Sequence, residues 1–229
     1  MDPGELALYF DHTHLRPNAL KQDIEQLCKE AETYGFHALC VNPYYVPQVV
    51  KRLEGSGVKV CSVVGFPLGA NLMDTKTGEA VLLRGLGCDE IDMVVNVAAL
   101  RNRDYDYVRE EIRQVRKAVS FAVLKVIIEM AYLEKKEVEK VLAILSEEGV
   151  DFVKTSTGFG LRPTTLEDVR FLVKYSPPGL KIKASGGIRD LQTVLTFIKA
   201  GVHRIGSSSS HKIVEEFLAT RSLHETDQD

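Results

Sequence analysis

The sequence has little net charge of either sign. Its 229 residues include 29 Lys and Arg against 32 Asp and Glu, which leaves a formal net charge of -3 at pH 7, and its pI is about 6.1. A protein with this balance has no broad positive field for a nucleic acid, so an anionic ligand must be met by a local set of donors. We therefore expect a small-molecule partner and no nucleic-acid partner.

Cysteine is scarce and is not clustered. The four cysteines, Cys28, Cys40, Cys61 and Cys88, lie far apart in the sequence, and no C-x-x-C pair occurs among them. This spacing argues against a zinc knuckle and against a dithiol redox motif. We expect four reduced thiols.

The sequence also lacks the features of an exported or membrane-embedded chain. Its first ten residues, MDPGELALYF, carry acidic residues where a secretory signal needs basic ones, and no apolar run approaches the roughly 20 residues of a membrane span. Hydrophobic residues make up 45% of the chain and charged residues 27%, as in soluble globular proteins. We expect no membrane partner and a cytoplasmic location.

The length suits one large domain, because barrels of alternating strands and helices use roughly 200 to 250 residues as one unit. No linker, low-complexity tract or short internal repeat interrupts the chain. We expect a single domain over 1–229, with polar or frayed ends at about 1–7 and 221–229.

Short β-rich runs alternate with helical stretches, which predicts an α/β fold with a parallel sheet and helical crossovers. Helix N-caps are indicated at Asn18, Asp74, Asp104 and Thr165, and a further helix at 134–148. The eight expected strands cover residues 6–10, 37–42, 58–66, 90–96, 124–130, 151–157, 180–186 and 203–208. Eight such units are what a closed (β/α)8 TIM barrel needs.

An open doubly wound sheet would give a similar alternation, and the glycine-rich segments decide between the two folds. No G-x-G-x-x-G follows the first strand, whereas Gly186-Gly187 and Gly206-Ser207-Ser208-Ser209 follow the last two. Barrels commonly hold phosphate at that position. We therefore predict a single TIM barrel.

Three expected strands carry an unusual residue toward their carboxyl ends, where barrels place catalytic groups. They are Asp92, Lys154 and Lys183. One interpretation is a structural ion pair between Asp92 and one lysine, because a lysine in an apolar strand costs several kcal/mol if it is unpaired. The other is a nucleophilic amine, since two lysines on strands about 4.8 Å apart favour the neutral form of one of them. Lys181 has the same strand parity as Lys183 but lies two residues earlier, nearer the barrel bottom. We expect it to be a solvated or paired structural lysine.

A phosphate site is indicated after the last three strands. Glycines let backbone N–H groups approach an anion, serine hydroxyls add donors, and the N-terminus of a following helix adds positive potential. The candidate residues are Gly158, Gly186, Gly187, Gly206, Ser208 and Ser209.

A metal-dependent amidohydrolase barrel is a rival, because His12 and His14 form an H-x-H pair in the first unit. Such a site also needs histidines on strands 5 and 6 and an aspartate on strand 8. The runs LKVIIEM and DFVKTST have no His, and HRIGSS has no Asp. We expect no metal, and a structural or supporting role for His12 and His14.

The segments DHTHLRP, ALCVNPYYV, VVGFPLGA, EIDMVVNVAAL, LKVIIEM, FVKTSTGFG, IKASGGIR and RIGSSSS follow one another along the chain. In this order they resemble the deoxyribose-phosphate aldolase family, from about residue 10 to residue 210. The resemblance implies a class I aldolase that needs no metal or organic cofactor. It cleaves 2-deoxy-D-ribose 5-phosphate reversibly into acetaldehyde and D-glyceraldehyde 3-phosphate, and is often a dimer or a larger homo-oligomer such as a tetramer.

The resemblance also assigns roles to residues. It makes Lys154 the Schiff-base nucleophile, Lys183 the cation that perturbs it, and Asp92 the carboxylate of a proton relay. It places Thr13 and Cys40 near the substrate, and phosphate on the six glycines and serines named above. The sequence departs from the family at Arg162, which follows the KTSTGFG loop, at Ser210 and Met130, and in ending at Asp229 without the terminal tyrosine of some relatives.

Two other functions remain open on the residues alone. A sugar-phosphate isomerase would use the same barrel and phosphate loops with Glu129, at the end of strand 5, as its base. A barrel that binds sugar phosphates as a sensor would have the phosphate site and no turnover.

Overall fold

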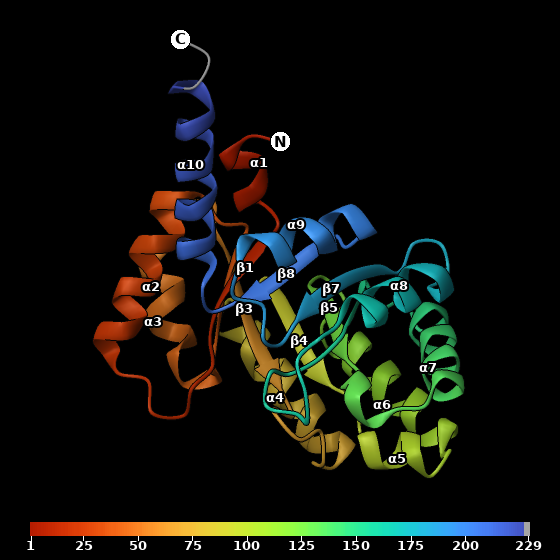
Figure 1. Ribbon diagram of the computed structural model, residues 1–229. Helices are drawn as coiled ribbons and strands as arrows, with labels where there is room; N and C mark the ends of the chain where they lie inside the picture. The colour runs from red at the N-terminus through yellow and green to blue at the C-terminus, as the bar shows by residue number, and fades with distance from the viewer. Residues whose placement is uncertain (227–229) are drawn as a thin grey trace.

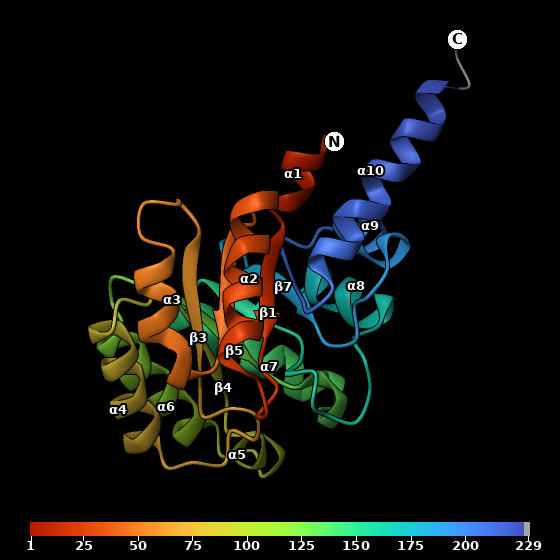
Figure 2. The same ribbon diagram turned by 90° about the vertical axis from the view of Figure 1, so that its left-hand side faces the viewer.

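The computed structural model describes residues 1–226. Eight parallel strands follow one another in sequence order and form a closed barrel, with β8 pairing back onto β1. The strands are β1 Phe10–His14, β2 Ala38–Val41, β3 Lys59–Val64, β4 Glu90–Val94, β5 Val123–Ile127, β6 Phe152–Lys154, β7 Lys181–Ser185 and β8 Arg204–Ser207. Helices follow the strands and cover the outside of the barrel (Figure 1, Figure 2). The predicted (β/α)8 TIM barrel is confirmed.

The helices begin largely where polar side chains can cap them. Asp104 and Thr165 cap their helices as predicted, since their side chains accept from the amides of Tyr107 and Asp168. The N-caps predicted at Asn18 and Asp74 are wrong, because these two helices start after Leu20 and Leu72. The helices are α1 Pro3–Ala7, α2 Lys21–Tyr34, α3 Val46–Arg52, α4 Met73–Gly85, α5 Val97–Arg101, α6 Tyr105–Ala118, α7 Lys135–Glu147, α8 Leu166–Tyr175, α9 Leu191–Ala200 and α10 Ser210–Thr226, with short 3-10 turns η1 Pro43–Tyr45 and η2 Met130–Tyr132.

The strand predicted at 6–10 is wrong, and so is the frayed end at 1–7. The Asp2 side chain accepts from the amide of Glu5 at 2.8 Å, and the Glu5 side chain accepts from the amide of Asp2 at 2.7 Å. This capping box starts helix α1, whose Leu6 and Ala7 are buried. The first strand therefore begins at Phe10 and contains the whole DHTH segment.

The C-terminal helix reaches further than expected. Helix α10 continues to Thr226, beyond the frayed end predicted from residue 221, and residues 227–229 lie outside the described part of the chain. It projects from the barrel beside α1 (Figure 1). Within the described residues, no helix combines the length and apolar character needed to span a bilayer.

The buried apolar side chains form two separate clusters. The larger lies between the outer face of the barrel and the helices, and includes Ile24 of α2, Ile112 of α6 and Leu142 of α7. Each such side chain contributes about 1.5–3 kcal/mol when fully buried. The smaller is a group inside the barrel around Leu15, Ala38, Cys40, Cys61 and Val63. Because the outer region supplies most of the apolar burial, the rest of the barrel interior can hold charged side chains.

Candidate active site

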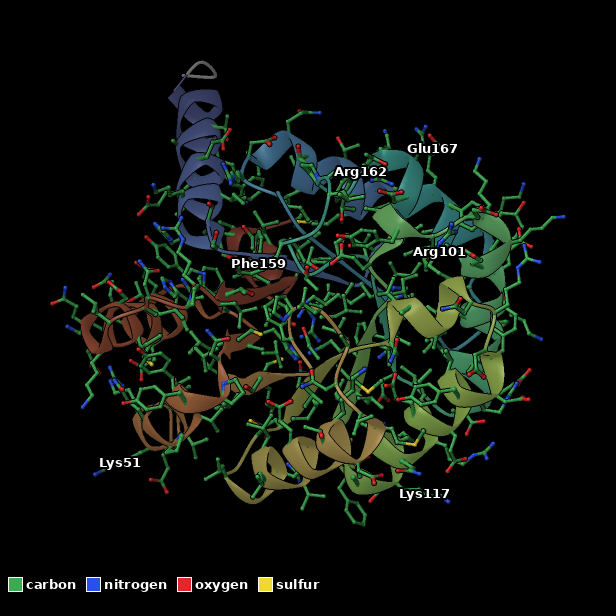
Figure 3. All side chains as sticks on the ribbon, turned by 90° about the horizontal axis from the view of Figure 1, so that it is seen from below. Lys51, Arg101, Lys117, Phe159, Arg162 and Glu167 are labelled. Carbon is green, nitrogen blue, oxygen red and sulfur yellow. The ribbon has the colours of Figure 1, made fainter. Side chains whose placement is uncertain are left out.

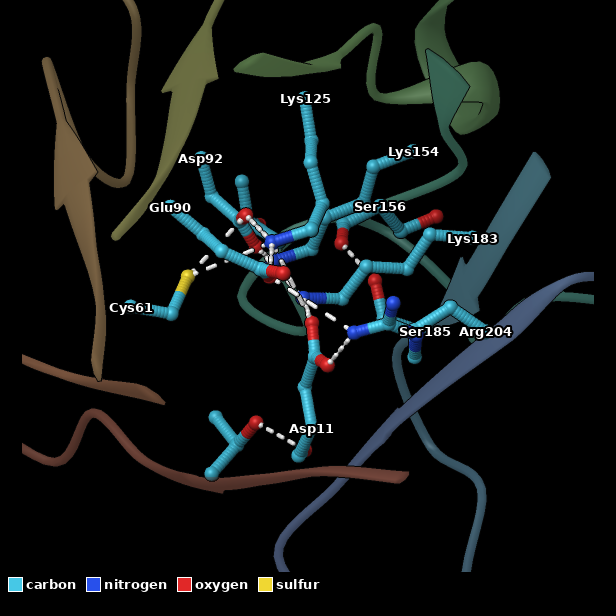
Figure 4. Close-up of polar contacts among 12 residues, drawn as sticks. Asp11, Cys61, Glu90, Asp92, Lys125, Lys154, Ser156, Lys183, Ser185 and Arg204 are labelled. Carbon is cyan, nitrogen blue, oxygen red and sulfur yellow. Dashed lines mark hydrogen bonds and ion pairs between the residues drawn. The ribbon is translucent and has the colours of Figure 1, made fainter. Parts of the chain in front are cut away.

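The barrel interior contains a cluster of buried charged side chains from six strands. Every second residue of these strands faces into the barrel. The pairing of neighbouring strands places Lys125 beside Asp92 and Lys183 beside Lys154. Each of the seven is less than 9% exposed. The cluster, drawn in Figure 4, consists of Asp11, Glu90, Asp92, Lys125, Lys154, Lys183 and Arg204.

Asp92 lies at the centre of this interior cluster. Its Oδ2 accepts from Lys154 Nζ and from Lys183 Nζ, both at 2.7 Å. Its Oδ1 accepts from Lys125 Nζ at 2.8 Å and from the Cys61 thiol at 3.3 Å. The structure thus brings the three predicted catalytic residues together, with the carboxylate between the two lysines.

Four members of the interior cluster were not predicted from the sequence. Lys183 also donates to Asp11, which accepts from Arg204 Nη1 at 2.7 Å on its other oxygen. Lys125 lies 2.6 Å from Glu90 Oε2. Inward parity on β1, β4, β5 and β8 was the signal that could have identified them, since Asp11, Glu90, Lys125 and Arg204 all lie on expected or adjacent strand positions.

Electrostatics fix the ionisation of the two groups beside Lys154. Burial raises the pKa of Asp92, but the ammonium groups of Lys125, Lys154 and Lys183 outweigh it and hold that pKa well below its ordinary value. Burial lowers the pKa of Lys183, but the carboxylates of Asp11 and Asp92 outweigh it and raise that pKa. At neutral pH Asp92 is therefore a carboxylate and Lys183 an ammonium.

A cavity of about 260 Å³ opens at the carboxyl end of the barrel, where β1, β6, β7 and β8 end. Lys154 is the only lysine among the described residues that lines it. Asp92 and Lys183 lie beneath Lys154 and do not belong to the wall. The wall also contains Thr13, His14, Arg16, Thr157, Gly158, Phe159, Ser185, Gly186, Gly187, Ile188, Arg189, Gly206, Ser207 and Ser208.

Six of the eight predicted binding residues line this cavity, and two do not. The backbone N–H of Ser209 donates to Ser207 Oγ at 3.0 Å, and Ser209 does not line the cavity wall. Cys40 is fully buried on β2, where it is the register partner of Cys61 and belongs to the same apolar group inside the barrel. Arg16 and Arg189 were missed: both are exposed cations in the wall, and no acidic partner is found for either within residues 1–226.

Two wall positions require glycine. At Gly187, where φ is +78°, an added Cβ would lie 2.6 Å from Pro163 Cβ. At Gly206 it would lie 2.9 Å from Ser185 Cβ and 3.2 Å from Lys183 Cε. Close packing of β7, β8 and the loop before α8 therefore depends on these positions having no side chain.

Glu129 supports the cavity wall from behind. It is 3% exposed, and its Oε2 accepts from the amide of Thr157 at 3.0 Å. A Cβ on Gly160 would lie 2.6 Å from its Oε1, so the loop covers this carboxylate. The position does not suit the base of an isomerase, which needs access to the substrate.

Two further cations, Arg162 and Lys181, lie outside the cavity wall. Arg162 makes a bidentate ion pair with Asp168, at 2.5 and 2.9 Å, at the start of α8. Figure 3 shows it out beside that helix, whereas Phe159 lies nearer the middle of the barrel end. Lys181 is exposed at the start of β7, with its Nζ 5.5 Å from the centre of the Phe152 ring.

Replacing Asp11 with Asn should destabilise the fold, because it leaves Lys183 and Arg204 buried beside a neutral amide. We expect the free energy of unfolding at pH 7 to fall by about 3–5 kcal/mol, measured by urea denaturation. Burial raises the pKa of Asp11, but the charges of Lys183, Lys125 and Arg204 outweigh it and lower that pKa. Its contribution is thus present above the unfolded pKa, near 4, and is lost as the pH falls further.

The difference between wild type and Asp11→Asn should therefore shrink below about pH 4. Asp106, which is exposed on α6, provides the matched control, and Asp106→Asn should leave stability nearly unchanged. Equal stability of wild type and Asp11→Asn at pH 7 would show that the cluster does not depend on this carboxylate.

Comparisons with known proteins agree with this geometry. A family model described as DeoC/LacD family aldolase matches residues 5–213. The deoxyribose-phosphate aldolase of Caldanaerobacter subterraneus subsp. tengcongensis is 48% identical over 215 residues, or 93% of each chain. A solved structure described as "QR15, an Aldolase" is 42% identical with a TM-score of 0.91, over 96% of this chain and 98% of its own. The tetrameric deoxyribose phosphate aldolase from Aeropyrum pernix is 34% identical with a TM-score of 0.89, over 96% of this chain and 93% of its own. The chain belongs to the DeoC/LacD family of aldolases.

Proposed function

We propose that this enzyme cleaves 2-deoxy-D-ribose 5-phosphate reversibly into acetaldehyde and D-glyceraldehyde 3-phosphate, with Lys154 as the Schiff-base nucleophile. The observation that carries the proposal is the position of Lys154. Its amine lines the cavity and is also bound at 2.7 Å to a buried carboxylate. The names of the relatives support the choice of substrate.

The reaction follows from an amine at the cavity floor. Lys154 Nζ attacks carbon 1 of the open-chain aldehyde, and loss of water gives an iminium ion. The bond between carbons 2 and 3 then breaks, and its electron pair moves into the iminium to form an enamine. The carbon-3 hydroxyl proton leaves at the same time, which releases D-glyceraldehyde 3-phosphate. Protonation of the enamine at carbon 2 and hydrolysis free acetaldehyde and restore Lys154.

Asp92 and Lys183 provide the proton transfers and the charge that these steps need. Asp92 touches Lys154 directly, so a water above Lys154 can carry the proton of the carbon-3 hydroxyl to this carboxylate and return a proton to carbon 2. The interior cluster has four cations, Lys154 among them, and three carboxylates. Apart from Lys154, the cluster therefore has three cations and three carboxylates, so its remaining charges balance, which is favourable in a dry interior.

The phosphate of the substrate binds at the other end of the cavity. The amides around Gly158, Gly186, Gly187 and Gly206 and the Ser208 hydroxyl provide donors. Thr13 also lines the cavity and is assigned to the reacting end of the substrate. Ser209 supports the Ser207–Ser208 turn, and Cys40 packs beneath the pocket. Arg16 and Arg189 supply positive charge at the opening, in reach of an anion.

The active assembly is a homo-oligomer, a dimer or a tetramer, as in the tetrameric relative from Aeropyrum pernix. Exposed apolar side chains, such as Leu68 and Leu72 at 75% and 74% exposed, offer surface for subunit contact. The cytoplasmic location stays a prediction, and the mechanism uses no metal or organic cofactor.

Lys154→Ala should abolish cleavage of 2-deoxy-D-ribose 5-phosphate, because no other lysine reaches the cavity within the described residues. We expect less than about 0.1% of the wild-type rate, measured by coupled detection of D-glyceraldehyde 3-phosphate. Lys181→Ala, at the exposed start of the neighbouring strand, should retain nearly full activity. Substantial turnover by Lys154→Ala would disprove its role, and no turnover by the folded wild type would disprove the function itself.

Ser208→Asp should weaken the phosphorylated substrate selectively, since it puts a negative charge in the cavity wall. Two like charges at about 4 Å repel by about 4 kcal/mol at an effective dielectric constant near 20, so KM should rise more than about a hundredfold. Ser209→Asp should have a smaller effect, because Ser209 lies outside the wall. Unphosphorylated deoxyribose is the control substrate. Equal losses for both sugars would place the phosphate elsewhere.

Lys183→Leu should move the acid limb of the pH–rate profile to higher pH. Loss of this ammonium removes a repulsion that favours the neutral amine and leaves Asp92 and Asp11 with more uncompensated negative charge. Both changes work against a neutral amine at the cavity floor, so activity should recover partly as the pH rises. The folding of the variant is checked by circular dichroism. An active variant with an unshifted profile would mean that Lys183 does not perturb the nucleophile.

A further inference from the structure

Three side chains of metal-binding type meet on the outside of the barrel, away from the aldolase cavity. His12 lies on β1, Glu30 on α2 and His211 on the first turn of α10. His12 Nε2 is 2.7 Å from Glu30 Oε2, and His211 Nδ1 is 3.4 Å from the same oxygen. One ligand atom from each residue falls within 4.8 Å of the other two.

The surroundings orient these groups toward one another. Gln26 donates to Glu30 Oε1 at 3.0 Å, which leaves Oε2 for the two histidines. The His12 ring packs on Phe36 at a centroid distance of 4.9 Å. His211 Nδ1 is a buried atom for which no hydrogen-bond partner is found in the described part of the chain, and it faces Glu30. In the tautomer with its proton on Nε2, this nitrogen carries a lone pair that a cation between it and Glu30 would satisfy.

The donor set also suits a transition-metal ion. Imidazole nitrogen and carboxylate oxygen are ligand types that zinc-type ions bind in proteins, and the three residues here offer two imidazoles and one carboxylate.

We propose that His12, Glu30 and His211 form a binding site for one divalent transition-metal ion of the zinc type, separate from the aldolase cavity. The ligands are His12 Nε2, Glu30 Oε2 and His211 Nδ1. Ligand distances near 2.0–2.1 Å in a tetrahedral site put ligand atoms roughly 3.3 Å apart, so the two measured separations need only small adjustments. Glu30 and His211 have side chains 16% and 25% exposed, which leaves the fourth position to water.

Coordination by His12 requires one proton shift. The lone pair of Nε2 must face the ion, so the ring carries its proton on Nδ1 in the bound form. His12 Nδ1 is buried, and no hydrogen-bond partner is found for it within residues 1–226. Metal-ligating histidines usually donate this proton to an acceptor, and lack of one lowers affinity about 10- to 100-fold. The site is therefore an exchangeable one rather than a tight structural site.

Other groups with metal-binding atoms are less suitable. Cys40, Cys61 and Asp92 form one such group, and Asp11, Cys61 and Glu90 another. Both lie in the barrel interior beside the buried lysines and Arg204, whose positive charge repels an added cation. His14 lines the aldolase cavity instead, so the H-x-H pair contributes a single ligand. The proposal departs from the expectation that this chain binds no metal.

The ion would connect β1, α2 and α10 close to the Ser207–Ser209 turn, which borders the proposed phosphate site. His12 is the register partner of Ser207, and His211 follows the Ser207–Ser209 turn by two residues. A bound ion would fix the first turn of α10 against α2 and β1 without entering the cavity. Since it binds only the folded protein, it should raise the midpoint of thermal unfolding as its concentration rises.

The test is a Co²⁺ titration of the chelator-treated protein, monitored by visible absorption, with Zn²⁺ competition and thermal unfolding in parallel. We expect one ion per chain, d–d bands of a nitrogen- and oxygen-ligated site, and displacement by Zn²⁺. His211→Ala should weaken binding at least about tenfold and abolish the thermal shift. Glu30→Gln, which removes the charge and keeps a polar side chain, should weaken it similarly.

Lys212→Ala is the matched control, because Lys212 is the exposed neighbour of His211 on α10. It should bind Co²⁺ as the wild type does. The proposal is overturned if the wild type binds no Co²⁺, if His211→Ala binds it with unchanged affinity, or if a sulfur-to-cobalt charge-transfer band assigns the ion to cysteine. Circular dichroism of each variant separates loss of the site from loss of the fold.

Discussion

The Asp92 carboxylate, shared among Lys125, Lys154 and Lys183, is the interaction on which the rest of the site depends. Each of these lysines is at most 2% exposed, and a buried ammonium without a counter-charge would cost several kcal/mol. Three ammonium groups around one carboxylate are still short of negative charge. Asp11 and Glu90 supply the missing negative charge. Arg204 pairs with Asp11 and adds one further cation to the same cluster.

This arrangement separates stability from chemistry. The helices and the outer face of the barrel bury most of the apolar surface, so the interior can hold an expensive set of charges. Lys125 and Lys183 have their ammonium groups fully enclosed by carboxylates and a thiol, whereas Lys154 has one side on Asp92 and the other on the cavity. Access to the cavity, rather than a difference in amino-acid type, therefore distinguishes the nucleophile from its neighbours.

Much of the fold and part of the site could be predicted from the sequence. Alternating β-rich and helical runs predict the barrel, and Asp92, Lys154 and Lys183 are predicted as site residues because charged residues are rare in apolar strands. The strand predicted at 6–10 is wrong because a short apolar segment suits a strand as well as a helix, and the Asp2–Glu5 capping box starts a helix there. Strand parity marks Asp11, Glu90, Lys125 and Arg204 as inward-facing, but the contacts among them could not be predicted, since the cross-strand register depends on the closed barrel. Ser209 is expected at the cavity because it follows Ser208 in the serine-rich segment, and Cys40 because of the family resemblance. Which side chains form the wall depends on the turn after β8 and on the direction in which β2 side chains point, and the sequence does not show either.

Borohydride reduction of the wild-type enzyme in the presence of acetaldehyde tests the central claim most directly. Reduction converts the Schiff base into a stable secondary amine, which intact mass and peptide mapping can count and locate. One ethyl group per chain, on Lys154, is the result predicted by an amine that alone faces the cavity. An adduct on Lys183 or Lys125, or no adduct on an enzyme that turns over its substrate, would contradict the account.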